Sequence, residues 1–371
     1  MGLIPTKNNA KMVPMELSLI KVFLPTVLTF AFGIIITPIF SNIFYKYRMW
    51  KQTARHVDGC TEDHCMSEEF KRIHNHEPEL NTPRVGGVII WMSICLAALV
   101  LFLIPTFFPS EISQKLNFVS KEQTVLPFIG LLVGAFIGLI NDFLTIYIKK
   151  GPFINGFPRS YMIALVTLSA FAFALWFYFK LGDSQIFIPI VHKVLSLGVW
   201  FIPVFMFVFL ATFSSGVIDG IDGLAGGVMA MIFGALSTIA FFQNQIDIAA
   251  FSLVVAGAIL AFLWFNIPPA RFWMGETGML GLMFALTIIV FLTDTVLILP
   301  IIGFPLVITA ASSAIQIISK KLRGPVKGKI FRVAPLHHHF EAIGWSREKI
   351  TMRYWIISTI FAIAGVIVAL I

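Results

Sequence analysis

The sequence predicts an all-α polytopic membrane protein with about ten transmembrane helices. Of its 371 residues, 58% are hydrophobic and only 12% are charged, and the mean hydropathy is +0.88. These apolar side chains, 38 Phe among them, exceed what one water-soluble core can bury, so most of them must face lipid. No break in composition marks a second domain, and we predict one integral-membrane domain over residues 1–371.

The composition also disfavours two other classes of protein. Three Cys are too few to cross-link a secreted disulfide scaffold of this length. A net charge of +8 would suit nucleic-acid binding in a soluble protein, but the retention of Lys and Arg on the cytoplasmic side of a membrane explains it more simply. We therefore expect the lipid bilayer, and no nucleic acid, as a partner.

Apolar runs long enough to cross about 30 Å of hydrocarbon recur along the chain. The first run is too long for a cleavable signal peptide, so it is expected to remain as a helix. The eighth and ninth runs are separated only by a short stretch near Asp294, which leaves the count uncertain by one. We predict helices at 17–43, 85–105, 125–147, 159–179, 195–213, 224–242, 248–265, 278–293, 296–318 and 353–371.

The basic residues orient these helices. Most of the 27 Lys and Arg residues fall in connections that would share one side of the membrane, and that side is the cytoplasmic one. Both termini are then expected outside. The two largest cytoplasmic connections are predicted at 44–84, a hydrophilic loop, and at 319–352, which contains three consecutive His residues.

Polar residues gather on this predicted cytoplasmic face. Asn141 and Asp142 end the third span, Asp219 and Asp222 lie between the fifth and sixth, and Glu276 precedes the eighth. A carboxylate costs about 2.5–3.5 kcal/mol at the bilayer centre and less near its surface, so each acid needs a partner or a use. Asp219 and Asp222 are one helical turn apart and share a face if their segment is helical.

The converging carboxylates indicate a metal site at a phosphate. Like charges repel unless a cation bridges them, and oxygen-only ligands favour Mg²⁺, with Mn²⁺ as an alternative. The candidate metal ligands are Glu276, Asp219 and Asp222. Lys149 and Lys150 add positive charge that suits phosphates. Together these features favour phosphoryl transfer between a water-soluble donor and a lipid acceptor.

A second group of candidate ligands lies in the 44–84 connection. It lacks the C-x₂-C and H-x₃-H patterns of zinc sites, and acidic and basic residues are mixed through the same segment. We expect a hydrophilic loop there rather than a zinc site. The residues are His56, Cys60, His64, Cys65, His74 and His76.

Four stretches resemble motifs of the polyprenyl-phosphate N-acetylhexosamine-1-phosphate transferase superfamily, and the likeness covers nearly the whole chain. The most specific is 331–341, followed by Gly344-Trp345 and by RYWII at 353–357; it resembles the branch that uses a muramoyl-pentapeptide nucleotide. The stretches are 81–87 (NTPRVGG), 219–225 (DGIDGLA), 265–278 (FNIPPARFWMGETG) and 331–341 (FRVAPLHHHFE).

The resemblance implies a reaction, a location and partners. UDP-N-acetylmuramoyl-pentapeptide and undecaprenyl phosphate would give lipid I and UMP with Mg²⁺, the first membrane step of peptidoglycan synthesis, at the cytoplasmic face of a bacterial inner membrane. The family also suggests a homodimer. Matched by position, the implied catalytic residues are Asp142, Asp219, Asp222, His337, His338 and His339, and Asn266 and Trp273 are implied to contact uracil. Lys149 and Lys150, from their charge, and Asn141, from its place beside Asp142, complete the candidate substrate-binding residues.

Several positions depart from the superfamily pattern. Asn141 and Glu276 stand where it has Asp, and Gly216 and Phe213 stand where it has Asn. An amide cannot act as the base proposed at position 141. A phosphate monoester is already largely dianionic near pH 7, however, so a positioning role is sufficient. Glu276 keeps the charge of Asp on a longer side chain.

Three alternative functions stay open at this stage. A relative that uses another UDP-N-acetylhexosamine, such as UDP-GlcNAc, is disfavoured by the 331–341 run. A catalytically weakened paralogue would bind substrates without turnover, which the departures at Asn141 and Glu276 allow. A transporter would need acids along a path at mid-membrane. For the transfer reaction itself, we expect the lipid phosphate to attack the nucleotide directly in a single displacement, rather than through a covalent aspartyl intermediate.

Overall fold

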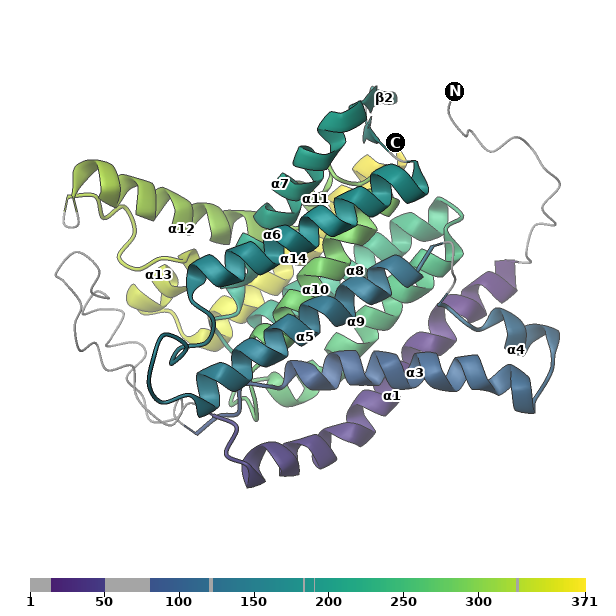
Figure 1. The fold of residues 1–371 in the computed structure, drawn as a ribbon, viewed down its shortest axis with the longest axis horizontal. Coiled ribbons are helices and arrows are strands. Elements are labelled where there is room, and N and C mark those ends of the chain that lie inside the picture. The colour runs from purple at the N-terminus through teal and green to yellow at the C-terminus, as the bar shows by residue number, and fades with distance from the viewer. Residues whose placement is uncertain (1–14, 51–80, 120–122, 183, 190, 325–326) are drawn as a thin grey trace.

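The protein is a bundle of long helices in the computed structural model, which describes residues 15–50, 81–119, 123–182, 184–189, 191–324 and 327–371 (Figure 1). Within that part of the chain, nine helical segments are long and apolar enough to cross a membrane. The predicted all-α polytopic fold class is therefore confirmed. Most of the 44–84 connection, with its His and Cys residues, lies outside the described ranges.

The nine candidate spans correspond to nine of the ten predicted runs. Two of them include short π or 3₁₀ segments at their ends. The spans are α1 (Met15–Lys46), α3 (Gly87–Phe107), α5 (Val125–Tyr147), α6 with η3 (Arg159–Leu175 and Trp176–Leu181), α7 between η4 and η5 (Gly198–Trp200, Phe201–Ser214 and Ser215–Ile218), α8 (Leu224–Phe242), α9 (Ile246–Asn266), α10 (Gly275–Leu292) and α14 (Arg347–Leu370).

The predicted span at 296–318 takes a different form. The chain turns at Gly303 between the short helix α11 (Leu299–Ile302) and α12 (Phe304–Arg323), and Pro305 lies in the first turn of α12, where its missing N–H costs nothing. Helix α12, which has three cations in its last turn, is not among the nine candidate spans. Because α13 (Leu336–Ala342) follows, the predicted 319–352 connection contains a helix of its own.

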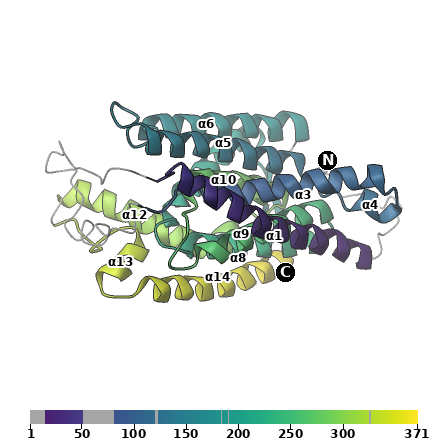
Figure 2. The same ribbon diagram turned by 90° about the horizontal axis from the view of Figure 1, so that it is seen from below.

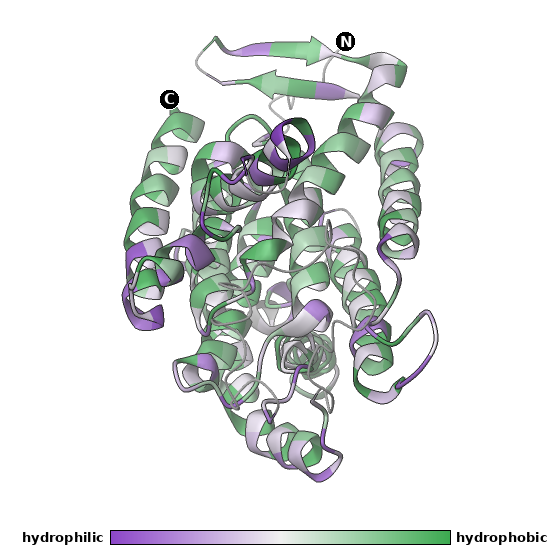
Figure 3. Ribbon diagram, turned by 90° about the vertical axis from the view of Figure 1, so that its left-hand side faces the viewer, coloured by the Kyte–Doolittle hydropathy of each residue, from purple (hydrophilic) through white to green (hydrophobic). Residues whose placement is uncertain are grey.

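Two short elements join the ends of the spans. Helix α4 (Glu111–Lys115) follows α3, and an antiparallel hairpin of β1 (Gln185–Ile188) and β2 (Lys193–Ser196) joins η3 to η4, with Gln185 opposite Ser196. Figure 3 shows hydrophobic residues along the helices and hydrophilic ones mainly at helix ends and in connections. That distribution is expected for a bundle surrounded by lipid.

Helices α8, α9 and α10 form the enclosed centre of the bundle, and the other spans surround them (Figure 2). Aromatic side chains supply much of the packing between the centre and α7. The rings of Phe205 and Phe291 lie 4.4 Å apart, and those of Phe209 and Phe284 lie 4.6 Å apart. Offset and edge-on contacts of this kind stabilise beyond the burial of area alone, which accounts for part of the high Phe content.

Helix α5 packs closely on α10 along a glycine stripe. Gly130, Gly134 and Gly138 recur every four residues and therefore lie on one face of α5. A methyl group on Gly138 would collide with the main-chain carbonyl of Glu276. Small residues at such spacing let two helix backbones approach in a membrane. Asp142, one turn further along the same face, thereby reaches the first turn of α10.

We expect Gly138→Ala to lower the free energy of unfolding by about 1–3 kcal/mol, because the added methyl group overpacks this contact. Gly234→Ala in α8 is the matched control, since a methyl group there meets nothing within 4 Å. The control should be neutral or slightly stabilising. Thermal unfolding in detergent measures both, and equal midpoints for the two variants would contradict the close approach of α5 and α10.

Candidate active site

The candidate site lies at one end of the bundle, called here the site end, where residues 81–86, 219–223, 267–274 and α13 meet. The first and third of these segments are hydrogen-bonded to each other. The Gly86 amide donates to the Trp273 carbonyl (2.9 Å), and the Trp273 amide donates to the Pro83 carbonyl (2.8 Å). This pairing holds Arg84 beside the start of α10.

The carboxylate of Asp142 occupies the first amides of α10. Asp142 accepts from the Thr277 amide at 2.9 Å and from the Glu276 amide at 3.3 Å, and Asp219 lies near the Gly275 amide, which favours its charged form. The unpaired amides and the dipole at a helix N-terminus favour negative groups in this position. The amides of Glu276 and Thr277 are consequently already satisfied and are not open for a substrate phosphate.

Glu276 and Asp219 present carboxylates that water can reach. Both residues are exposed, whereas Asp142 is buried. The protein that surrounds Asp219 raises its pKa, and the charge of Glu276 raises it further, while Arg84 and the Gly275 amide act in the opposite direction. Two neighbouring carboxylates repel each other when both are ionised, and a cation bound between them would relieve this repulsion.

The donor set suits a hard divalent cation. In the described ranges there is no group of three or more His, Cys, Asp and Glu side chains arranged to hold a metal. Mg²⁺, however, needs only one or two protein carboxylates, because water and substrate phosphates complete its shell. Glu276 and Asp219 therefore fit Mg²⁺ at the edge of the bundle, where a diphosphate could approach.

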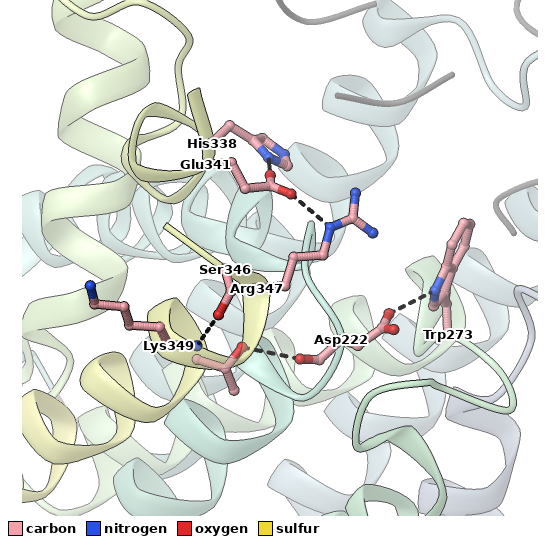
Figure 4. Close-up of polar contacts among 8 residues, drawn as sticks. Asp222, Trp273, His338, Glu341, Ser346, Arg347 and Lys349 are labelled. Carbon is pink, nitrogen blue, oxygen red and sulfur yellow. Dashed lines mark hydrogen bonds and ion pairs between the residues drawn. The ribbon is translucent and has the colours of Figure 1, made fainter. Parts of the chain in front are cut away.

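Asp222 does not join this pair. Residues 219–223 form a turn rather than a helix, with Gly223 at a φ of +75°, so the condition for Asp219 and Asp222 to share a helical face is not met. Asp222 instead accepts from Trp273 Nε1 at 3.0 Å and from the Ala270 amide at 3.2 Å (Figure 4). Burial raises the pKa of Asp222, and these two hydrogen bonds partly offset that effect.

The two predicted uracil contacts are differently placed. The indole ring of Trp273 lies under the guanidinium group of Arg84, 5.0 Å from its centre, in a cation–π contact. Asn266 is buried and uses both ends of its amide: Oδ1 accepts from the Gly223 amide at 2.9 Å, and Nδ2 donates to the Phe272 carbonyl at 2.8 Å. Asn266 thus ties the two loops together in this structure.

The three histidines separate into two groups. His337 and His338 are buried and face the 219–223 turn, since a methyl group on Gly220 would lie 2.6 Å from His337 Nε2 and 2.8 Å from His338 Nε2. His339 is turned away, and its Nδ1 accepts from the Arg332 amide at 3.2 Å. Only the first two histidines therefore lie against the segment that carries Asp219.

Glu341 links His338 to the start of α14. His338 Nδ1 and Arg347 Nε each lie 2.7 Å from a different oxygen of Glu341, and Figure 4 shows the three side chains in a row. Burial alone would raise the pKa of Glu341, but the hydrogen bonds from His338 and Arg347 outweigh it and hold the pKa below its ordinary value. A charged Glu341 accepts a hydrogen bond from the Nδ1–H group of His338, and Nε2 of His338 then faces Gly220.

The remaining predicted site residues surround the connection after α5. Asn141 is buried, and its Oδ1 accepts from the Phe157 amide at 2.7 Å, so it holds the 148–158 connection in place. Lys149 and Lys150 are exposed in that connection and take no part in the contacts described above. Gly216 lies in η5, where a methyl group would make only an ordinary contact with Met279.

Three residues of the site were given no role from the sequence: Arg84, Glu341 and Arg347. For two of them, the sequence contains a pattern that could have indicated a place in the site. Arg84 lies inside the 81–87 stretch, and Glu341 follows His338 by three residues, a spacing that brings side chains together on a helix. Arg347 is separated from α13 by a turn, so only the fold brings it to Glu341.

Comparison with known proteins agrees with this arrangement. The family model described as "Glycosyl transferase family 4" matches residues 124–293. Proteins named phospho-N-acetylmuramoyl-pentapeptide-transferase align over most of the chain. The one from Bacillus subtilis (strain 168) is 32% identical over 79% of this chain and 85% of its own length. The one from Anoxybacillus flavithermus is 33% identical over 79% and 85%.

A third relative aligns over a larger share of the chain. The transferase from Halalkalibacterium halodurans is 29% identical over 92% of this chain and 96% of its own length. The residues matched by the family model include α5 and α10, whose ends carry Asp142 and Glu276. With identity above 30% across more than two thirds of the sequence, the chain belongs to the phospho-N-acetylmuramoyl-pentapeptide-transferase family.

Proposed function

We propose that this protein transfers phospho-N-acetylmuramoyl-pentapeptide from its UDP donor to undecaprenyl phosphate, which gives lipid I and UMP. Relatives named for this activity support the proposal. The structural observation that carries it is the meeting of Asp142, Asp219, Glu276 and Arg84 at the N-terminus of α10. These groups lie at helix ends on one side of the bundle, where a soluble nucleotide and a lipid phosphate can meet, rather than along a path at mid-membrane as a transporter requires.

We assign Mg²⁺, or Mn²⁺ in its place, to Glu276 and Asp219. When bound, the ion would neutralise charge on the diphosphate and on the departing UMP. Asp222 is assigned instead to the placement of Trp273, because both of its carboxylate oxygens are already bonded within the protein. The three candidate metal ligands expected from the sequence are thereby reduced to two carboxylates.

The proposed reaction is a single displacement. An oxygen of the lipid phosphate attacks the β-phosphorus of the nucleotide, and the bond to the bridging oxygen breaks as UMP leaves with that electron pair. Arg84 supplies positive charge beside the acidic pair, Asp142 fixes the start of α10, and Nε2 atoms of His337 and His338 face the adjoining turn. Asn141 holds a loop, consistent with a reaction that needs no base at that position.

The distribution of Lys and Arg supports a cytoplasmic location of the site end, with both termini outside. We place the protein in the bacterial inner membrane on the same ground and on the bacterial origin of its relatives. A homodimer, suggested by the family, remains part of this proposal. Sedimentation or mass photometry of the detergent-solubilised protein would test it.

The direct test of function is a comparison of two sugar-nucleotide donors with the purified full chain in the presence of undecaprenyl phosphate and Mg²⁺. Release of UMP and formation of lipid I should require UDP-N-acetylmuramoyl-pentapeptide. Turnover of UDP-GlcNAc instead would identify a relative with another donor. Binding of the pentapeptide nucleotide without UMP release, in Mg²⁺ and Mn²⁺ alike, would identify a non-catalytic paralogue.

We expect Glu276→Gln to lower turnover by roughly a hundredfold or more and to abolish its rise with Mg²⁺, because the variant removes one of two accessible metal-binding carboxylates. Asp222→Asn should also reduce turnover, through Trp273, while the Mg²⁺ concentration for half-maximal activity stays unchanged. Metal titrations of both variants measure the difference. A similar shift in Mg²⁺ dependence for the two would refute the division of roles between these acids.

Glu341→Gln should lower turnover roughly tenfold to a hundredfold by releasing the orientation of His338, and it should lower stability by about 1–2 kcal/mol. The pKa of Glu341 is lowered in the fold, so its stabilisation is present above the ordinary value near 4.5 and is lost as the pH falls through the lowered folded value. The difference in unfolding midpoint from wild type should be constant from about pH 6 to 8 and shrink in acid.

The matched control for that variant is Glu16→Gln, which removes an exposed acid near the start of α1. It should change neither turnover nor the unfolding midpoint at neutral pH. A Glu341→Gln variant that is fully active, or whose midpoint differs from wild type by the same amount in acid as at neutral pH, would rule out the proposed role of Glu341.

A further inference from the structure

The 219–223 turn carries Asp219, yet it lies between a 3₁₀ segment and α8 with no regular helix or strand of its own to fix its shape. At Gly223, the last residue before α8, both polar groups of the main chain are bonded to side chains of other helices. The amide donates to Asn266 Oδ1 of α9 at 2.9 Å, and the carbonyl accepts from Trp355 Nε1 of α14 at 3.1 Å. The placement of Asp219 therefore depends on partners outside its own segment.

Two side chains of α14 hold consecutive carbonyls of this turn. Thr351 is buried, and its hydroxyl donates to the Asp222 carbonyl at 3.2 Å, while Trp355 takes the next carbonyl, that of Gly223. The indole fits there because Gly227, in the first turn of α8, has no side chain: a methyl group on it would collide with Trp355 Nε1. The packing of α14 against α8 thereby fixes the indole N–H group on the turn.

The same face of α14 also reaches the histidine segment. Arg347 precedes Thr351 by four residues and so lies on the same side of the helix. Arg347 Nε bonds to Glu341, whose other oxygen lies 2.7 Å from His338 Nδ1 (Figure 4). One helix face is therefore bonded both to the turn that carries Asp219 and to the segment that carries the buried histidines.

We propose that Thr351 and Trp355 are positioning residues for the metal: by holding two carbonyls of the turn, they set where the Asp219 carboxylate lies relative to Glu276. Both act through the main chain of the turn and not on the metal itself. The inference rests on the proposed function, because it takes Asp219 and Glu276 as the pair that binds Mg²⁺. Removing an outer partner of a metal ligand typically weakens metal binding or activity by roughly tenfold to a hundredfold.

Binding of Mn²⁺ to the purified full chain tests the proposal without turnover, through the electron paramagnetic resonance signal of the free ion. Thr351→Val and Trp355→Phe each remove one hydrogen-bond donor and keep most of the side chain. Each should weaken Mn²⁺ binding roughly tenfold and raise the Mg²⁺ concentration for half-maximal turnover to a similar extent, with the protein still folded at the assay temperature. Thr351→Ser keeps the hydroxyl and should bind Mn²⁺ as the parent does.

Thr359→Val and Trp264→Phe are the matched controls. The Thr359 hydroxyl donates to the Trp355 carbonyl within α14, and Trp264 is exposed on α9, so both variants should bind Mn²⁺ as the parent does. Asp222→Asn keeps the carbonyl that Thr351 holds, and it should likewise leave the affinity for Mn²⁺ unchanged.

Unchanged Mn²⁺ affinity in Thr351→Val and Trp355→Phe, together with loss of binding in Glu276→Gln, would overturn the positioning role and leave the metal assignment in place. A Thr351→Ser variant as weak as Thr351→Val would also overturn the positioning role, because side-chain packing and not the hydroxyl would then be responsible. Full Mn²⁺ binding by Glu276→Gln, or none by the parent, would instead refute the metal assignment, and this inference with it.

Discussion

The approach of α5 to α10 determines the rest of the site. Glycines at every fourth residue of α5 leave no side chain between the two backbones, and Asp142 continues that face to the first amides of α10. Asp219 lies near the Gly275 amide at the same helix end. With the amides of Glu276 and Thr277 satisfied by Asp142, α10 leaves Glu276 facing water beside Asp219, where the acid pair can hold a cation.

The loops around this helix end act as one framework. Asn266 joins the 219–223 turn to the segment before α10, and the Gly86 and Trp273 pairing adds the loop that carries Arg84. Trp355 of α14 donates from Nε1 to the Gly223 carbonyl at 3.1 Å, which ties the 219–223 turn to α14. Polar groups that might be assigned to substrate from their type alone, such as Asn266 and Asn141, are thus used to order the protein around the site.

The histidine segment depends on a different support. Glu341 couples His338 to Arg347, and Gln316 of α12 binds the chain just before α13. The buried histidines are consequently held from two helices, α12 and α14, of which α12 projects from the bundle (Figure 1).

The sequence by itself determined the membrane class, nine of the ten helices and the end of the bundle that carries the acids, because hydropathy and charge act locally along the chain. It could not divide the acids into those that cap α10 and those that face water. That division depends on backbone approach at Gly138 and on the turn at Gly223. The pairing of Arg347 with Glu341 depends on the turn between α13 and α14, and the break at Gly303 depends on tertiary packing, so neither follows from hydropathy along the chain.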